Sequence, residues 1–375
     1  MWNNIIGQKR VINILKNIYI NNKIAHAYIF SGKEGTGKDA VAIEFAKLVN
    51  CDSRINETEA CNNCTNCQRI KSINSVNFKI ITALPAGRKE LTEDENPISI
   101  LKPEDIETYQ TEIKKKSEDP YYKISIPNAN DIKITSIRQI RKEIYLTGEK
   151  GKKKIYLISN ADRMNPQSSN AFLKILEEPP GDALIILTTS RINSLLPTIT
   201  GRCQKINFDS IGKKDLIEYL MKMKEGLSEK EAEFYANIAD GSITNCSNIV
   251  NSYLLELREQ SISMLASLLS RNYIEFGKII SNVVGYKDKQ KVRQFLVMLI
   301  YWFRDISTIS SGGNSNIINT DKIERLKKFN DKFKSDNFRI INLIEDGIRD
   351  IDMNINLELL LYNLAYKIKS LIKIG

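Results

Sequence analysis

The sequence predicts an α/β region built on a parallel sheet, followed by an all-α region. Short apolar runs alternate with helical patterns from residue 8 to about 208, and strand signals nearly vanish after Asp209. A glycine-rich loop at residues 32–38 follows the first apolar run and precedes a helical pattern. Helices between successive strands imply right-handed crossovers, and hence a parallel sheet that is covered on both faces.

Length and composition are those of a folded chain with several domains. Its 375 residues suffice for two or three domains, and 42% hydrophobic content is ordinary for a protein with filled cores. The N-terminus lacks the pattern of a secretion signal, and no apolar stretch reaches bilayer length, so we expect a cytoplasmic protein without a membrane partner. The net charge of +10 favours a partner with phosphates, although a Lys- and Asn-rich composition also spreads positive charge over all surfaces.

Five apolar runs are the candidate strands. Runs of about four to eight apolar residues without strict alternation suit strands that are buried on both faces. One helix is expected directly after Lys38, and another from about Pro166 to Glu177. Pro166 suits the first turn of the second helix, and the sequence Pro-Pro-Gly ends its pattern. The candidate strands are Ala27–Ser31, Phe78–Thr82, Ile155–Ser159, Leu184–Thr189 and Gln204–Phe208.

Between these strands, residues 85–131 form a charged stretch that contains prolines and has little periodicity. We interpret it as an insertion, either a solvated excursion or an element that contacts a partner. The region after Asp209 shows helical spacing, with a glycine-rich linker at 312–316. Its expected helical segments are Lys213–Lys224, Ser228–Ala239, about Asn248–Thr308, Thr320–Phe333 and Phe338–Ile374.

The glycine-rich loop has the features of a phosphate-binding loop. Gly32, Gly35 and Gly37 let backbone amides turn inward around an anion. Lys38 adds a full charge at the start of the next helix. The motif G-x-x-x-x-G-K-[ST] then requires a hydroxyl, where this chain has Asp39. Two like charges about 4 Å apart repel by roughly 4 kcal/mol at an effective dielectric near 20, so we expect ATP binding to be weakened unless a cation offsets the repulsion.

The candidate strand at 155–159 ends without the acidic pair that magnesium-dependent hydrolysis uses. Carboxylates at that place hold the metal ion and orient the attacking water, but this chain has Ser159 and Asn160. Asp162 lies farther on, and we interpret it as a capping or charge-pairing residue. The sequence therefore predicts that the chain has no ATP hydrolysis of its own.

Four closely spaced cysteines predict a structural zinc site. Zinc prefers four tetrahedral ligands, and thiolates on a short loop share one ion readily. Disulfides are disfavoured in the cytoplasm, and four thiolates leave no open position for catalysis. We interpret the remaining cysteines, Cys203 and Cys246, as small buried hydrophobes. The predicted zinc ligands are Cys51, Cys61, Cys64 and Cys67.

Taken together, these features and several further motifs resemble the bacterial DNA polymerase III clamp-loader subunits, which are AAA+ proteins. The resemblance covers roughly residues 1–210. It implies an AAA+ P-loop domain at 1–209 with a zinc module at 51–67, a helical lid domain at 210–250 and a helical collar for oligomerisation at 251–375. The motifs that carry it are His26-Ala27-Tyr28-Ile29-Phe30-Ser31-Gly32, Ala161-Asp162-Arg163-Met164-Asn165, Asn170-Ala171-Phe172-Leu173-Lys174-Ile175-Leu176-Glu177-Glu178-Pro179-Pro180 and Gly201-Arg202-Cys203-Gln204.

Within this family the gamma and tau motor subunits keep an intact ATP site, whereas delta prime subunits commonly have a degraded one, and this chain resembles the delta prime branch. A Ser-Arg-Cys motif in the family projects its arginine into the ATP site of the neighbouring subunit. Here Gly201-Arg202-Cys203 keeps the arginine, so Arg202 is implied as an arginine finger acting in trans. An ordinary ion pair near a strand start is the alternative for Arg202. Thr244 stands where motor subunits carry a lid arginine.

The resemblance implies a non-hydrolysing component of the DNA polymerase III holoenzyme. It would help a heteropentamer load the sliding clamp onto primed DNA at the nucleoid. The implied partners are the delta and gamma/tau subunits, the sliding clamp and, through the complex, primer-template DNA. Two alternatives stay open. One is a gamma/tau-type ATPase motor that uses Asp39 or Asp162 for magnesium chemistry, and the other is a zinc-dependent DNA-binding module that acts alone.

Overall fold

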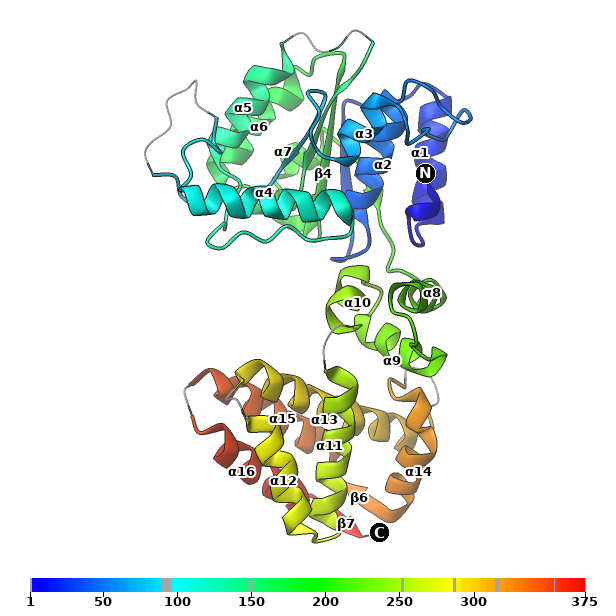
Figure 1. Cartoon of the computed structure of the whole chain (residues 1–375), viewed down its shortest axis with the longest axis vertical. Helices are drawn as coiled ribbons and strands as arrows, with labels where there is room; N and C mark the ends of the chain where they lie inside the picture. Colours follow the sequence, from blue (N-terminus) through cyan, green and yellow to red (C-terminus); the bar gives the residue numbers. More distant parts are fainter. Residues whose placement is uncertain are drawn as a thin grey trace. The chain divides into compact units, whose positions relative to one another are not determined.

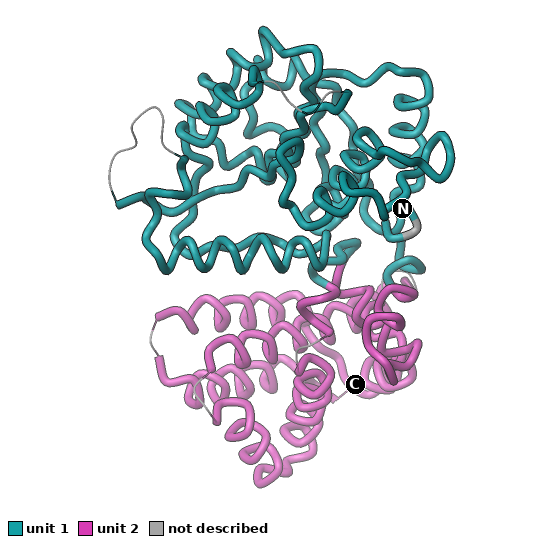
Figure 2. Tube along the Cα trace, turned by 45° about the horizontal axis from the view of Figure 1, so that its top comes forward, with its two compact units in different colours: residues 1–216, 240–245 teal, residues 217–239, 246–375 magenta. Residues whose placement is uncertain are grey.

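The computed structural model forms two compact units, shown in different colours in Figure 2. The first unit contains residues 1–216 and 240–245, and the second contains residues 217–239 and 246–375. The predicted lid, residues 210–250, is thus shared between the units, and the three-domain division stays a prediction. The structure describes residues 2–88, 96–146, 149, 151–250, 253–285, 288–313, 317–353 and 355–374.

A five-stranded parallel sheet is the centre of the first unit. Its strand order is β2-β3-β4-β1-β5, and every neighbouring pair is parallel. The predicted α/β fold class is therefore confirmed, and each strand boundary lies within one residue of its predicted position. The strands are β1 (Ala27–Ser31), β2 (Phe78–Ile81), β3 (Lys154–Ile158), β4 (Ala183–Thr189) and β5 (Gln204–Asn207).

Helices cover both faces of the sheet, and this explains why the central strands lack polar alternation. All residues of β1, β3 and β4 are buried. Figure 1 shows α1, α2 and α3 on one side of the sheet and α5 and α6 on the other. Helix α6 begins as predicted, with Pro166 in its first turn and the Asn165 side chain accepting a hydrogen bond from the Ser168 N–H. The helices of this unit are α1 (Lys9–Ile20), α2 (Lys38–Asn50), α3 (Thr65–Lys71), α4 (Pro103–Glu118), α5 (Ile134–Ile144), α6 (Pro166–Glu177) and α7 (Pro197–Thr200).

The carboxyl ends of the central strands bring the candidate nucleotide site together. The phosphate loop follows β1, Ser159 follows β3, and Thr188 lies near the end of β4. The register pairs Ser31 with Thr189 and Ile158 with Leu187, so these three chain segments end at one edge of the sheet. Parallel strands carry their ligand sites at this edge because the loops after the strands converge there.

The insertion differs from a solvated excursion. Residues 103–118 form helix α4, and its Glu112 and Lys116 side chains are buried. Pro103 occupies the first turn of the helix, where its missing N–H leaves no hydrogen bond unmade. The many charges hid this helix from sequence analysis because they weaken its apolar periodicity. Residues 89–95, which belong to the predicted insertion, lie outside the described residues.

The second unit is helical, as predicted, apart from one short two-stranded sheet among the residues that the structure describes. Strands β6 (Phe333–Ser335) and β7 (Ile372–Ile374) pair antiparallel, and they are too short to show alternation in the sequence. The long predicted segments are broken where Asn272, Asp288 and Asn356 cap new helices through their side chains. The helices are α8 (Lys213–Met223) and α10 (Ile243–Val250), which both begin in the first unit, together with α9 (Glu229–Ala239), α11 (Leu254–Leu269), α12 (Tyr273–Val284), α13 (Lys289–Ser310), α14 (Ile323–Lys332), α15 (Asn337–Asp350) and α16 (Leu357–Ser370).

A partly buried polar cluster in the second unit ties α9 to the segment before α14. The Asn237 side chain donates to the backbone carbonyls of Ile317 (3.3 Å) and Ile318 (3.0 Å). The Arg258 guanidinium forms two hydrogen bonds of 2.9 Å with the Asp321 carboxylate, a bidentate geometry that favours burial of this ion pair. These contacts hold α9 to α11 and to residues 317–321 in one packed body.

Candidate functional site

The phosphate loop joins β1 to α2 in the conformation that its glycines permit. Gly35 and Gly37 have φ values of 77° and 85°, a left-handed conformation that glycine adopts without steric penalty. The Lys38 ammonium donates to the backbone carbonyls of Gly32 (2.7 Å) and Lys33 (2.6 Å). Burial lowers the pKa of Lys38, while nearby carboxylates oppose that shift. The four residues predicted to cradle phosphate thus share one loop.

Asp39 lies in the first turn of α2, where three side chains hold its carboxylate. Oδ1 accepts a hydrogen bond from Thr188 Oγ1 (2.7 Å), and Oδ2 accepts one from Ser159 Oγ (2.8 Å). The Lys116 ammonium of α4 lies 3.2 Å from Oδ2. Burial opposes ionisation, but Lys116 and the two hydroxyls outweigh it, so the pKa of Asp39 is lowered. Sequence analysis treated Asp39 as a lone charge beside the phosphates, whereas the fold gives it a cationic partner.

The space above the phosphate loop is small because residues 116–124 occupy it. The remaining cavity measures about 50 Å³ and is lined by the phosphate loop, by residues 116–124 and by the ends of β3 and β4. Pockets for small ligands usually measure about 300–1,000 Å³. Thr244 also lines the cavity, and its hydroxyl donates to the backbone carbonyl of Tyr121 (3.2 Å). Thr244 therefore contacts the segment that covers the phosphate loop.

The residues after β3 have structural partners. Asn160 has a φ of 54° and lines the small cavity, and its backbone N–H donates to Thr188 Oγ1 (3.3 Å). The Asp162 carboxylate is buried, with Oδ2 2.7 Å from Arg191 Nη2 and Oδ1 2.7 Å from Thr189 Oγ1. The interpretation of Asp162 as a charge-pairing residue is confirmed. Both of its oxygens are engaged by residues that follow or end β4.

Arg202 lies just after α7, on the surface of the first unit. Its Nη2 lies 3.0 Å from Glu177 Oε1, and its Nη1 donates to the Thr198 carbonyl (3.0 Å). The two side chains of the pair are 39% and 49% exposed. An exposed pair of this kind contributes about 0–1 kcal/mol, so releasing Arg202 toward another partner costs little. The ion pair considered as the alternative for Arg202 is present in the single chain.

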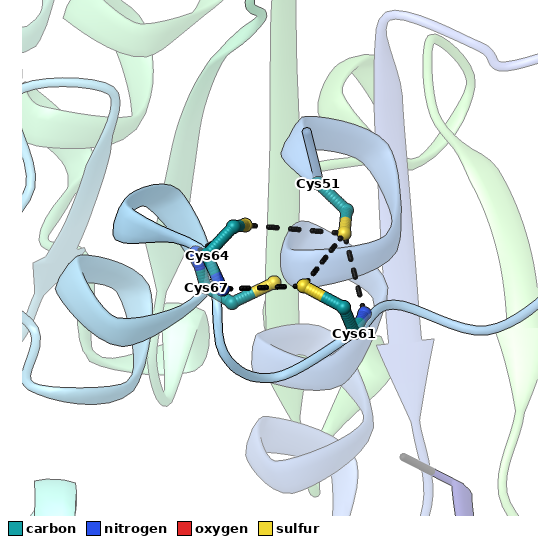
Figure 3. Close-up of side chains that lie close together, drawn as sticks. All are labelled: Cys51, Cys61, Cys64 and Cys67. Atoms are coloured by element: carbon teal, nitrogen blue, oxygen red, sulfur yellow. Dashed lines mark hydrogen bonds between the residues drawn. The ribbon is translucent and has the colours of Figure 1, made fainter. Parts of the chain in front are cut away.

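Four cysteine side chains from two helices and the loop between them meet at one point (Figure 3). Their sulfur atoms all lie within 4.8 Å of one another. Cys51 ends α2, Cys61 lies in the loop, Cys64 caps α3 and Cys67 lies in its first turn. The Sγ of Cys51 is 3.5 Å from that of Cys61 and 4.0 Å from that of Cys64. Zn–S bonds of about 2.3 Å in a tetrahedron place sulfurs about 3.8 Å apart, so the cluster fits one such ion.

Backbone groups around the cysteine cluster favour thiolates. The Cys64 N–H donates to Cys61 Sγ (3.2 Å), and this bond with other donors lowers the pKa of Cys61 to about 6. Burial raises the pKa of Cys67, because an apolar environment disfavours the charged thiolate. The four thiolates could hold a metal ion with no open coordination position, and its contribution would be to stabilise the fold. Cys203 and Cys246 are buried away from the cluster, as predicted, and burial raises the pKa of both to about 12.

A basic groove between α5 and α6 was missed by sequence analysis. It has a volume of about 810 Å³, and its lining includes Arg138, Arg141, Lys142 and Lys174 but no acidic side chain among the described residues. Three of these cations come from one face of α5, since positions three and four apart lie on the same side of a helix. This spacing is visible in the sequence, but the contribution of α6 depends on how the two helices pack.

A sequence model of the family described as DNA polymerase III, delta subunit, matches residues 7–212, which is more than half of the chain. The chain belongs to this clamp-loader family. The match spans the sheet, the phosphate loop and the cysteine cluster. The resemblance stated from the sequence motifs is therefore confirmed at the level of the family, and the AAA+ fold follows with it.

Curated relatives of this clamp-loader chain include both subunit types that sequence analysis considered. DNA polymerase III subunit delta prime of Bacillus subtilis strain 168 is 26% identical over 323 residues, covering 86% of this chain and 83% of the relative. Subunit tau of the same strain is 27% identical over 293 residues, covering 76% of this chain but 41% of the relative. The chain is thus a clamp-loader subunit of DNA polymerase III, a protein of DNA replication.

Two solved structures are also similar to this clamp-loader chain. A gamma subunit-related protein from Thermotoga maritima is 17% identical with a TM-score of 0.45, covering 96% of this chain and 99% of that one. A RuvB variant from the same organism is 13% identical with a TM-score of 0.39, covering 85% and 88%. Both TM-scores are low, and neither likeness bears on function. Within the described ranges, no helix is both long and apolar enough to span a bilayer.

Proposed function

We propose that this chain is the delta prime subunit of the DNA polymerase III clamp loader and acts as its non-hydrolysing stator. The observation that carries the proposal is Asp39, which replaces the magnesium-binding hydroxyl of the phosphate loop and pairs with Lys116 at 3.2 Å. Hydrolysis needs a metal ion between the phosphates and protein oxygens, together with a group that orients water. Ser159 and Asn160 supply no carboxylate at the end of β3.

Arg202 is the residue through which the stator would act on a motor subunit. A guanidinium supplied across an interface stabilises charge on the transferring phosphoryl group and raises the rate by about 10³ to 10⁵. Its ion pair with Glu177 is exposed and therefore weak. Interface formation can exchange this pair for a phosphate contact at a small energetic cost. Gly201 replaces the serine of the family motif, so packing at the interface has to aim the arginine.

The proposed partners are the delta and gamma/tau subunits, the sliding clamp and, through the complex, primer-template DNA. The basic groove supports a partner with phosphates, because clustered cations release counterions when they contact nucleic acid. The second unit would supply the helical collar of the ring. Affinity capture from the native cell tests this assembly, and recovery of stoichiometric delta and gamma/tau subunits is the expected result.

The experiment that tests the stator role compares reconstituted loaders that differ at Arg202. We expect Arg202→Ala to leave assembly intact and to lower DNA-stimulated ATP turnover at the neighbouring motor site by about 10³-fold or more. Arg69→Ala is a matched control, because Arg69 is 50% exposed and forms a similar ion pair with Glu149. Turnover that is equal in the Arg202 and Arg69 variants would remove Arg202 from the mechanism.

A gamma/tau-type motor subunit is the alternative, since tau also matches this chain. That alternative requires steady-state ATP turnover by the purified chain, lost on Lys38→Ala. A DNA-binding module that acts alone instead requires salt-sensitive DNA binding without partners. We expect neither activity from the isolated chain.

The proposed metal in the cysteine cluster is structural zinc. Four sulfur ligands and the spacing of their atoms suit zinc, which forms closed tetrahedral sites of this type. Elemental analysis of the native protein tests the assignment. Protein without zinc and with four freely reactive thiols in the cluster would exclude it.

A further inference from the structure

The cation that faces Asp39 belongs to the protein itself. Lys116 is buried, its ammonium lies 3.2 Å from Asp39 Oδ2, and it also donates to the backbone carbonyls of Pro120 and Tyr122, each at 2.7 Å. In a working phosphate loop a divalent cation balances the phosphate charge and is held by the residue at the position of Asp39. Lys116 therefore supplies positive charge where the metal ion would otherwise be needed.

The segment that carries this cation is held in a fixed shape. The buried Glu112 carboxylate accepts hydrogen bonds from the Tyr122 hydroxyl (2.8 Å) and the Ser125 N–H (2.7 Å). Asp119 caps the turn after α4 by accepting a hydrogen bond from the Tyr121 N–H (2.8 Å). A loop tied at several points loses little further entropy when it covers a site, so its position does not depend on a ligand.

Tyr121 lies directly on the phosphate loop. A Cβ added at Gly37 would meet Tyr121 Cε1 at 2.8 Å, so the ring is packed against the backbone whose amides would face phosphate. The Tyr121 hydroxyl accepts a hydrogen bond from the Ile6 N–H (2.7 Å), and its carbonyl accepts one from Thr244. Lys123 forms an ion pair with Glu34 of the phosphate loop. The covering segment is thus tied to three separate parts of the first unit.

We infer that residues 116–124 are a built-in occupant of the phosphate loop, with Lys116 in the place of the divalent cation and Tyr121 over Gly37. The chain therefore excludes nucleotide by filling its own site, in addition to lacking groups for hydrolysis. The cavity of about 50 Å³ leaves no room for a nucleotide. This inference deepens the proposed non-hydrolysing role. It depends on that proposal only for the assumption that the site is inactive.

Measurements of nucleotide binding by the full chain distinguish two reasons for weak binding: a site that residues 116–124 occupy, and a phosphate loop that lacks its hydroxyl. Mg-ATP is titrated calorimetrically into wild type, into Asp39→Thr, and into a triple variant that adds Lys116→Ala and Tyr121→Ala. Asp39→Thr restores the motif but leaves Tyr121 over Gly37, so we expect it to bind no better than wild type. The triple variant is expected to bind about tenfold or more tightly than Asp39→Thr. Equal affinity of these two variants, or micromolar binding by wild type, overturns the inference.

Hydrogen–deuterium exchange tests the same inference without any substitution, so it also decides the matter should the triple variant fail to fold. We expect the amides of residues 116–124 to exchange equally with and without millimolar Mg-ATP. Faster exchange with nucleotide would mean that the segment is displaced and is not a resident occupant. Different results refute the two proposals. Nucleotide binding without turnover would refute the inference that residues 116–124 occupy the phosphate loop, but it would leave the stator role intact. Unchanged loader activity in Arg202→Ala would refute the role of Arg202, but it would leave the inference about residues 116–124 intact.

Discussion

The ion pair between Asp39 and Lys116 makes a measurable contribution to the stability of the first unit. At 3.2 Å and an effective dielectric near 20, the attraction is roughly 5 kcal/mol before desolvation is subtracted. Removing one member of a buried pair costs about 3–5 kcal/mol, because the other charge is left without a partner. The Asp39 side chain keeps 20% of its surface exposed. We therefore expect Lys116→Met to lower the free energy of unfolding by about 3 kcal/mol, at the lower end of this range.

Neutralising Asp39 in the same chain should recover most of this loss. In Asp39→Asn combined with Lys116→Met, the amide can still take part in hydrogen bonds with Ser159 and Thr188, and no buried charge is left alone. The carbonyls of Pro120 and Tyr122 still lose the Lys116 donor, so we expect this double variant to be destabilised by about 1 kcal/mol. Lys114→Met is the matched control, because Lys114 is exposed on the same helix, and its effect should stay within about 0.5 kcal/mol.

Differential scanning calorimetry measures these differences. The proposed metal site lies in the first unit, so we expect the transition of that unit to be recognised by its response to chelation. A loss of about 3 kcal/mol lowers the Tm of a unit of this size by about 6–12 °C. Two results would refute the assignment of Lys116 as the partner of Asp39. One is a Tm of Lys116→Met equal to that of the Lys114→Met control, and the other is a double variant that is no more stable than Lys116→Met.

Three further outcomes follow from the structure. Chelation of the proposed metal, or Cys64→Ser, should unfold α3 and lower the Tm of the first unit. Added zinc should restore the chelated protein but not the Cys64→Ser variant. Circular dichroism measures the loss of helix, and calorimetry measures the change in Tm. Gly37→Ala should destabilise the first unit by about 2 kcal/mol, because φ is 85° and the new methyl group meets the Tyr121 ring. The loss caused by Gly37→Ala should be smaller in a Tyr121→Ala background than in the wild-type background, and equal losses would mean that the ring is not the cause. Arg258→Ala should destabilise the second unit by about 3 kcal/mol in denaturant unfolding, and Asp321→Asn in the same chain should relieve part of the loss; no relief would mean that the pair is not the cause.

Local patterns in the sequence were sufficient for the sheet and for both candidate sites. Strands covered on both faces must be apolar throughout, so the five runs could be located to within one residue. The phosphate loop and the four cysteines are also short motifs whose residues lie close in sequence, and a short chain segment brings such residues together regardless of the remaining fold. The family follows from the same motifs, and the comparisons confirm it.

The tertiary structure alone decided what lies in the phosphate loop. Lys116 is one of many lysines in a charged stretch, and nothing in its neighbourhood in the sequence distinguishes it from the exposed Lys114. Its pairing with Asp39 depends on where α4 crosses the carboxyl edge of the sheet, which is set by the packing of segments far apart in the chain. The charge that sequence analysis treated as a defect of the nucleotide site is, in the folded protein, the anchor of the segment that covers it.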